Sequence, residues 1–126
     1  MSGLVLEYEK AVDVKEIHVY ENHCPGALAR VITFGEGKRH RVLWRGEDPW
    51  KLENGRNIAK LPVRKGAPIK RIKIYLNSKD IKGWNQIDAV GLLDVNGKMH
   101  WAIGVAASSA YGNSPVDPGV FGGLAR

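Results

Sequence analysis

The chain is poor in cysteine and has no long apolar run. Cys24 is the single cysteine, which excludes an internal disulfide and a metal site built from cysteines alone. No apolar stretch approaches the length of about 18 residues that a membrane-spanning helix needs. The N-terminus also lacks the basic-then-apolar pattern of a secretory signal. The chain as given is therefore expected neither to span a membrane nor to direct its own export.

Several motifs of catalysis and cofactor binding are missing as well. No Gly-x-Gly-x-x-Gly run leads from a strand into a helix, and there is no Walker-type loop. No Gly-x-Ser-x-Gly elbow surrounds Ser108 and Ser109. His23 and Cys24 are neighbours on an extended segment, so their side chains point in opposite directions. We therefore expect no catalytic residue and no nucleotide cofactor.

The sequence gives no clear metal site. A zinc site on a helix uses histidines at a short repeated spacing, which this chain lacks. Three or more of its four histidines could still converge in space to form a metal site. They are His18, His23, His40 and His100. The run Asp94-Val95-Asn96-Gly97 is too short to supply six calcium ligands, and a hairpin turn explains it.

What is present is a basic chain of ordinary composition. Its 126 residues fit one domain, and 44% hydrophobic with 25% charged residues is typical of a folded globular protein. The net charge of +6 and pI of about 9.6 would attract nucleic acid, acidic glycans or anionic lipid head groups. The alternative is that the charge serves solubility, because the basic residues are scattered.

Alternation of apolar and polar residues predicts an all-β protein. Leu4, Leu6 and Tyr8 alternate with more polar neighbours, which is typical of a half-buried strand. No segment has the pattern of a strong amphipathic helix. An antiparallel β-sandwich of about eight short strands is the simplest architecture. We expect a β-hairpin over 27–44 and further strands at 4–9, 14–21, 58–63, 69–76, 87–93 and 99–105.

Turn residues define the connections between these strands. Residues 45–57 are polar and predict a long loop, and Pro62 makes 58–63 an edge strand or a strand end. The pair Asn96-Gly97 predicts a type I′ turn that folds 99–105 back on 87–93. The mostly apolar strand 87–93 should be covered on both faces. We place the sandwich at 1–105 and a Gly-, Pro- and Ser-rich tail or exchanged arm at 106–126.

Three segments carry a resemblance to a known family. They are Trp-Asn-Gln-Ile-Asp-Ala-Val at 84–90, Ile-His-Val-Tyr-Glu-Asn-His-Cys-Pro-Gly-Ala-Leu-Ala-Arg at 17–30, and Arg-Val-Leu-Trp-Arg-Gly at 41–46. In this order they resemble the discoidin-like, galactose-binding-like β-sandwich modules, in particular their pappalysin-type branch. The resemblance implies a jelly-roll fold and a binding module of a larger extracellular or cell-envelope protein. Related modules sometimes hold a structural calcium, which stays open here.

The order of the last segment departs from that family. A run like Trp101-Ala102 followed by Ala-Ser-Ser-Ala-Tyr-Gly at 107–112 typically opens the module, whereas here it stands near the end. The chain is then a permuted or minimal module, or half of one module with the beginning of the next. A third alternative is that a second copy covers the incomplete sheet edge. We therefore predict a homo-oligomer.

Sugar recognition by a β-sandwich needs an aromatic side chain and forked polar groups on loops at one end. The long loop offers such groups, and so does the turn after residue 20. Packing of Trp44 against the core, and backbone hydrogen bonds to Glu21, are the structural alternatives. The candidate ligand-binding residues are Glu21, Asn22, His23, Trp44, Arg45, Glu47, Asp48 and Trp50.

A second candidate surface is basic. Its basic residues cluster in sequence, with Asp80 as the acidic residue among them. If they lie on one sheet face, they could bind acidic polysaccharide or nucleic acid. The segment holds few aromatic residues for base stacking, so nucleic acid is not favoured. These residues are Arg64, Lys65, Lys70, Arg71, Lys73, Lys79 and Lys82.

We therefore predict a non-catalytic module that binds carbohydrate or protein partners. The alternative is a structural module that completes its sheet by self-assembly.

Overall fold

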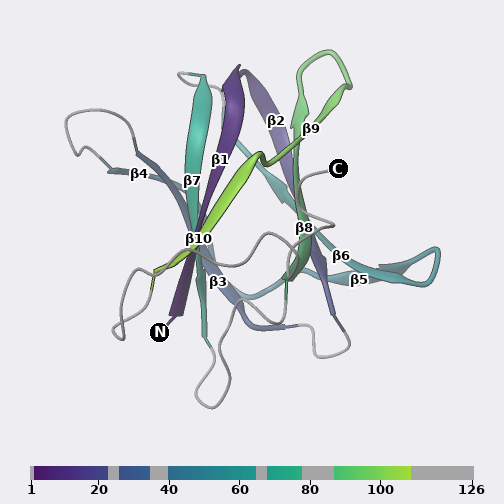
Figure 1. Cartoon of the computed structure of the whole chain (residues 1–126). Coiled ribbons are helices and arrows are strands. Elements are labelled where there is room, and N and C mark those ends of the chain that lie inside the picture. The colour runs from purple at the N-terminus through teal and green to yellow at the C-terminus, as the bar shows by residue number, and fades with distance from the viewer. Residues whose placement is uncertain (1, 23–25, 35–39, 65–67, 78–86, 109–126) are drawn as a thin grey trace.

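The chain forms two antiparallel five-stranded sheets, with the first on the left and the second on the right of Figure 1. The computed structural model describes residues 2–22, 26–34, 40–64, 68–77 and 87–108. The strands are β1 (Ser2–Val12), β2 (Val14–Glu21), β3 (Leu28–Phe34), β4 (His40–Arg45), β5 (Lys51–Glu53), β6 (Arg56–Pro62), β7 (Ile69–Leu76), β8 (Ile87–Asp94), β9 (Met99–Trp101) and β10 (Gly104–Ser108). Sheet A has the order β10-β1-β7-β3-β4, and sheet B has the order β5-β6-β2-β8-β9. The predicted all-β antiparallel sandwich is confirmed, with ten strands in place of about eight.

Alternate side chains of both sheets fill the space between them. Leu4 and Leu6 of β1 are fully buried, as are Ile72 and Ile74 of the neighbouring β7 and Val19 of β2 in the other sheet. Burying one such side chain contributes about 1.5–3 kcal/mol. The period of two that predicted the strands is thus the pattern that builds the core. For β2 and β7 the predicted and observed bounds agree.

Strand β8 is covered on both faces, as its apolar sequence predicted. Val90 and Leu92 face the core, while Gly91 on the outer face lies opposite Trp101 of β9. A Cβ atom at position 91 would lie 3.1 Å from Trp101 Cζ3 and would also meet the side chain of Met99. A glycine is therefore required where these two side chains lie over the sheet.

The prediction of one long loop over 45–57 is wrong, because these residues form a hairpin. Strands β5 and β6 pair through Glu53 and Arg56, with Asn54 and Gly55 between them. Both central residues have left-handed backbones, with φ of 50° and 76°. This is the conformation that an Asn-Gly pair in a two-residue turn favours.

The turn at Asn96-Gly97 differs from the predicted type I′ geometry. It does join β8 and β9 as a hairpin, but of its residues only Gly97 has a positive φ, at 88°. The side chain of Asp94 accepts hydrogen bonds from the N–H groups of Asn96 (2.8 Å) and Lys98 (2.9 Å). Its other oxygen lies 2.8 Å from His100 Nε2. These contacts stabilise a turn that needs one left-handed residue in place of two.

Two strand assignments near the sheet edges also change. Strand β6 lies between β5 and β2, so it is not an edge strand, although Pro62 does end it. Residues 99–105 do not form one strand: β9 pairs with β8 in sheet B, and β10 pairs with β1 in sheet A. The hydrogen bond from Ile103 N to the Glu7 carbonyl (2.8 Å) lies at the crossing between the sheets. The boundary placed between 105 and 106 falls inside β10, and residues 109–126 lie outside the described part.

One polar contact joins the two sheets through the core. The Tyr8 hydroxyl on β1 donates to the Val90 carbonyl on β8, at 3.2 Å, and the Tyr8 side chain is 1% exposed. Burial raises the pKa of Tyr8 far above its ordinary value, so the hydroxyl stays protonated and remains a donor.

We expect Tyr8→Phe to lower the free energy of unfolding by about 0.5–1.5 kcal/mol, because it removes one buried hydrogen bond while keeping the ring. Tyr75→Phe, on the outer face of sheet A, is the matched control and should change stability little. Urea unfolding followed by tryptophan fluorescence measures both. Equal effects of the two substitutions would contradict a role for the inter-sheet bond.

Candidate functional site

The end of β2 meets the connection between β4 and β5 through two carboxyl groups. Glu21 is 6% exposed and its Oε1 accepts the Gly26 N–H at 3.2 Å. Asp48 accepts two backbone N–H groups, that of Leu28 at 3.1 Å and that of Trp50 at 3.0 Å. The two acidic side chains thus fix three chain segments at one end of the sandwich.

Glu21 is held in its protonated form. Burial and the neighbouring Asp48, which bonds to the neutral acid and repels the anion, raise the pKa of Glu21 to about 8. The N–H of Gly26 acts in the opposite direction. The buried Oε2 of Glu21 has no hydrogen-bond partner among the described residues, so a negative charge on it would be poorly compensated.

This pair positions the surrounding loop residues. Trp50, which is 40% exposed, follows Asp48 and lies near the start of β3, where a Cβ at Gly26 would lie 3.8 Å from its Nε1. The Asn22 carbonyl accepts the Asn57 side-chain N–H at 3.0 Å. Four predicted site residues therefore come together at this end of the sandwich: Glu21, Asn22, Asp48 and Trp50.

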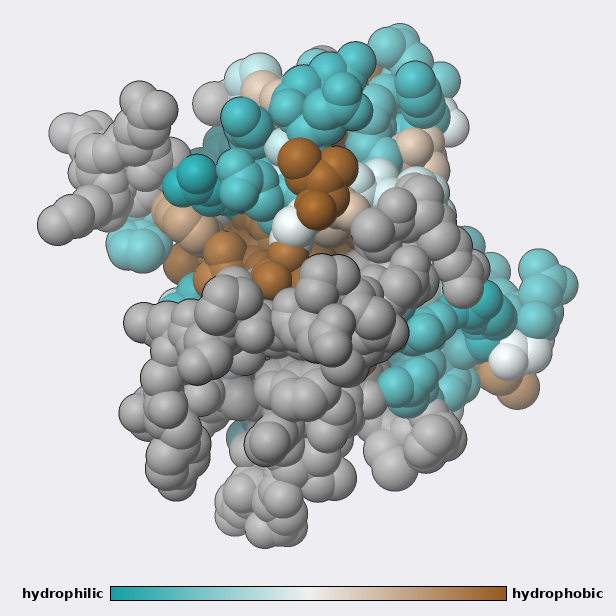
Figure 2. All heavy atoms as spheres, viewed as in Figure 1, coloured by the Kyte–Doolittle hydropathy of each residue, from teal (hydrophilic) through white to brown (hydrophobic). Residues whose placement is uncertain are grey.

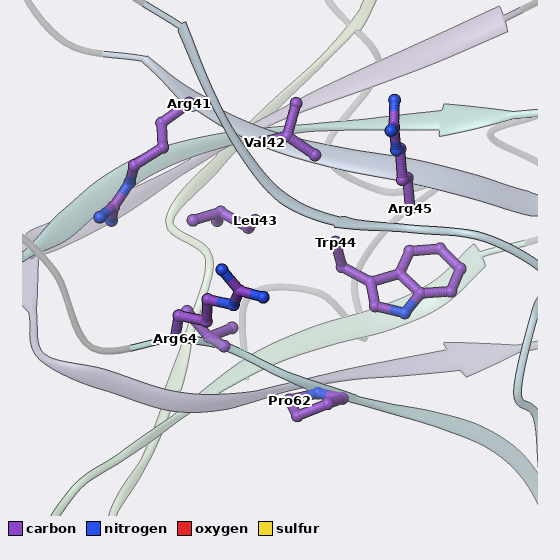
Figure 3. Close-up of a pocket in the computed structure, with 8 residues that line it drawn as sticks. Arg41, Val42, Leu43, Trp44, Arg45, Pro62 and Arg64 are labelled. Carbon is purple, nitrogen blue, oxygen red and sulfur yellow. The ribbon is translucent and has the colours of Figure 1, made fainter.

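A groove of about 870 Å³ lies between β4 and the end of β6. Figure 3 shows Leu43 and Trp44 directed from β4 toward the opposite wall, and Arg64 directed back toward β4. Arg45 extends from the other side of β4. The groove is lined by Arg41, Val42, Leu43, Trp44, Arg45, Pro62, Val63 and Arg64.

The groove combines an apolar wall with cationic donors. Leu43, Trp44 and Val63 are partly buried and pack against the core, so their positions are fixed by the sandwich itself. Arg41 and Arg64 carry planar guanidinium groups that donate several hydrogen bonds. None of the eight lining residues has a carboxyl group. The groove can therefore hold a ligand with an apolar face and with hydroxyl or anionic groups.

The other predicted residues are dispersed. Trp44 packs against the core as well as lining the groove, and Arg45 lies at its margin. Glu47 is exposed on the connection between β4 and β5, while His23 lies outside the described residues. The sequence did not identify Pro62 and Val63, because these come from the opposite sheet and no sequence spacing connects them to β4.

No metal centre is found in the described part of the chain. There, no group of three or more His, Cys, Asp or Glu side chains is arranged to hold a metal ion. His18 lies 2.9 Å from Glu16, and His100 lies 2.8 Å from Asp94, so each histidine has a single carboxylate partner.

Comparison with known proteins finds no matching family model, curated protein or solved structure. The resemblance to discoidin-like modules therefore stays a prediction. In the described ranges there is no helix with the length and apolarity needed to cross a membrane.

Raising the pH should weaken the fold through Glu21. Because its folded-state pKa is raised from 4.5 to about 8, the stabilisation is fully present below the unfolded-state value and is lost as pH rises through the folded-state value. Thermal unfolding between about pH 5 and about pH 9 measures this loss. Glu21→Gln keeps a neutral donor beside Asp48, so its melting temperature should fall less over the same range.

Glu47→Gln, an exposed carboxyl on the same connection, is the matched control and should behave as the wild type. A Glu21→Gln profile that follows the wild type across the whole range would show that Glu21 does not carry the excess proton.

Proposed function

We propose that this chain is a non-catalytic carbohydrate-binding module that holds its ligand in the groove beside β4. The observation that carries the proposal is the placement of Trp44 and Leu43 on one wall, with Arg64 directed toward them from the other. The volume of the groove, about 870 Å³, lies within the range of about 300–1,000 Å³ typical of small-molecule sites. The proposed setting is a larger extracellular or cell-envelope protein, which the resemblance to discoidin-like modules favours.

Binding follows from the chemistry of a sugar ring. The apolar face of a pyranose packs against the Trp44 indole and Leu43, where removal of both surfaces from water stabilises the complex. Guanidinium N–H groups of Arg41 and Arg64 donate to hydroxyl oxygens around the ring. The ligand is bound and released unchanged.

Substitutions of Trp44, in the groove, and of Trp50, at the loop end, distinguish these two candidate sites. Trp44→Leu keeps an apolar side chain against the core but removes the aromatic face, so we expect it to weaken glycan binding about tenfold, equivalent to about 1.4 kcal/mol. Trp50→Leu, outside the groove, should change the affinity less than about twofold. A glycan array identifies the ligand, and calorimetry on the wild type and both variants measures the affinities.

The reverse ranking of the two variants would move the site to the loop end around Glu21, Asp48 and Trp50. Absence of any bound glycan across neutral and acidic classes, at millimolar concentration and with a folded protein, would reject the proposed function.

Self-assembly is the second candidate, and strand β5 favours it. This strand forms one edge of sheet B, and Leu52 at its centre is 67% exposed. The β5–β6 hairpin, at the right of Figure 2, is otherwise largely hydrophilic. An edge strand of this kind offers backbone groups and a side chain to a second copy. We expect light scattering to show an oligomer at tens of micromolar, and Leu52→Lys to convert it into a monomer. A strictly monomeric wild type would reject this candidate.

A further inference from the structure

The outer face of sheet A carries basic and aromatic side chains in ordered rows. The register places Arg45, Arg30 and Tyr75 side by side across β4, β3 and β7. The next row contains Val42, Ile32 and Lys73. In the third row, His40 lies opposite Phe34 and Arg71 lies opposite Glu7. Ile32 is 4% exposed although it faces away from the core, so these side chains pack together over it.

Aromatic rings hold the cationic groups in place. The Arg30 guanidinium lies 4.2 Å from the centre of the Tyr75 ring, and the Lys73 ammonium lies 4.9 Å from the same ring. Arg71 lies 6.0 Å from the centre of the Phe34 ring. Each such contact attracts the cation to the face of the ring and restricts the rotamers of the long side chain. Arg30, Arg71 and Lys73 are therefore partly ordered before any ligand arrives.

The outer face of sheet B has a different charge pattern. There, Arg56 pairs with Asp88 at 2.5 Å and Lys60 pairs with Glu53 at 3.1 Å. On sheet A, Arg71 pairs with Glu7 at 3.4 Å. The positions that the register assigns to the outer face of sheet A hold Arg30, Arg45, Arg71 and Lys73 against the carboxyl group of Glu7, with the exposed Glu9 two residues further along β1. Positive charge is thus concentrated on one face of the sandwich.

We infer that the outer face of sheet A binds an acidic polysaccharide and that this names the ligand class of the module. The inference rests on the proposed function, since the ligand is a glycan in both. Its carboxylate or sulfate groups bind the guanidinium groups of Arg30, Arg45 and Arg71 and the ammonium group of Lys73.

The geometry favours a linear polyanion. The three rows are spaced two residues apart along the strands, so the cations extend over roughly 14 Å. An extended chain that carries several charged groups can span this distance, whereas one isolated phosphate cannot. The face also continues into the groove, because Val42 and Arg45 belong to both surfaces. A glycan held beside Trp44 therefore has a cationic path across sheet A.

The same contacts disfavour base stacking by a nucleic acid. Single-stranded nucleic acids bind to protein surfaces largely by stacking on open aromatic rings. Here Arg30 and Lys73 lie against Tyr75, and Arg71 lies against Phe34. The surface consequently presents cations supported by the rings.

Two double variants with the same loss of charge test the inference. Arg45→Gln with Lys73→Gln removes one Arg and one Lys from the outer face of sheet A. Arg56→Gln with Lys60→Gln does the same on sheet B and is the matched control. The probes are a sulfated octasaccharide, an oligogalacturonate, a neutral oligosaccharide of equal length, a single-stranded oligonucleotide and a polyglutamate peptide, with binding measured by calorimetry at low and high salt.

We expect an acidic oligosaccharide to bind more tightly than the other three classes, with an affinity that falls as salt screens the charges. The sheet A double variant should bind it about tenfold more weakly, and the sheet B double variant less than about twofold. Thermal unfolding of both variants confirms that they are folded.

Equal losses in the two variants would show an effect of net charge alone and would overturn the inference. Tighter binding of the oligonucleotide or the peptide would overturn it as well. Equal binding of neutral and acidic sugars would reject the inference while leaving the proposed function intact, whereas no binding of any sugar would reject both.

Discussion

The removal of alternate apolar side chains from water, between two facing sheets, is the interaction on which the structure depends. Leu4, Leu6 and Tyr8 of sheet A meet residues such as Val19 and Leu92 of sheet B in one continuous core. The site residues are held indirectly, since Leu43, Trp44 and Val63 reach the groove only because they also pack against that core.

Local patterns predicted much of the fold, because a strand with one buried face imposes a period of two on its own sequence. The bounds of β2 and β7 follow directly from it. Turns were harder. The same dipeptide occurs at Asn54-Gly55 and Asn96-Gly97, yet only the first pair has two left-handed residues. At the second pair the side chain of Asp94 provides the hydrogen bonds.

The candidate site was less accessible to sequence reasoning, because its parts converge across sheets. The sequence points to both Glu21 and Asp48 as ligand-binding residues, but nothing in their spacing shows that Asp48 raises the pKa of Glu21. Arg64 was placed in a basic cluster and not beside Trp44. Of that cluster, Arg71 and Lys73 do lie on the outer face of sheet A, where Arg30 and Tyr75 join them through strand register. Register is a property of pairs of strands and cannot be read from either strand alone.

The chain changes sheets after β1, β2, β4, β6, β7 and β9, so neither sheet is built from a continuous segment. Each sheet needs strands from both halves of the sequence, so neither sheet can be complete before the second half of the chain takes part. Contacts between residues distant in sequence dominate this fold. Topologies of this kind fold slowly, because the entropy lost on closing long loops opposes the formation of such contacts. Because the strands of the two sheets alternate along the chain, a truncation cannot remove one sheet and leave the other intact. We therefore expect the two sheets to unfold as one cooperative unit.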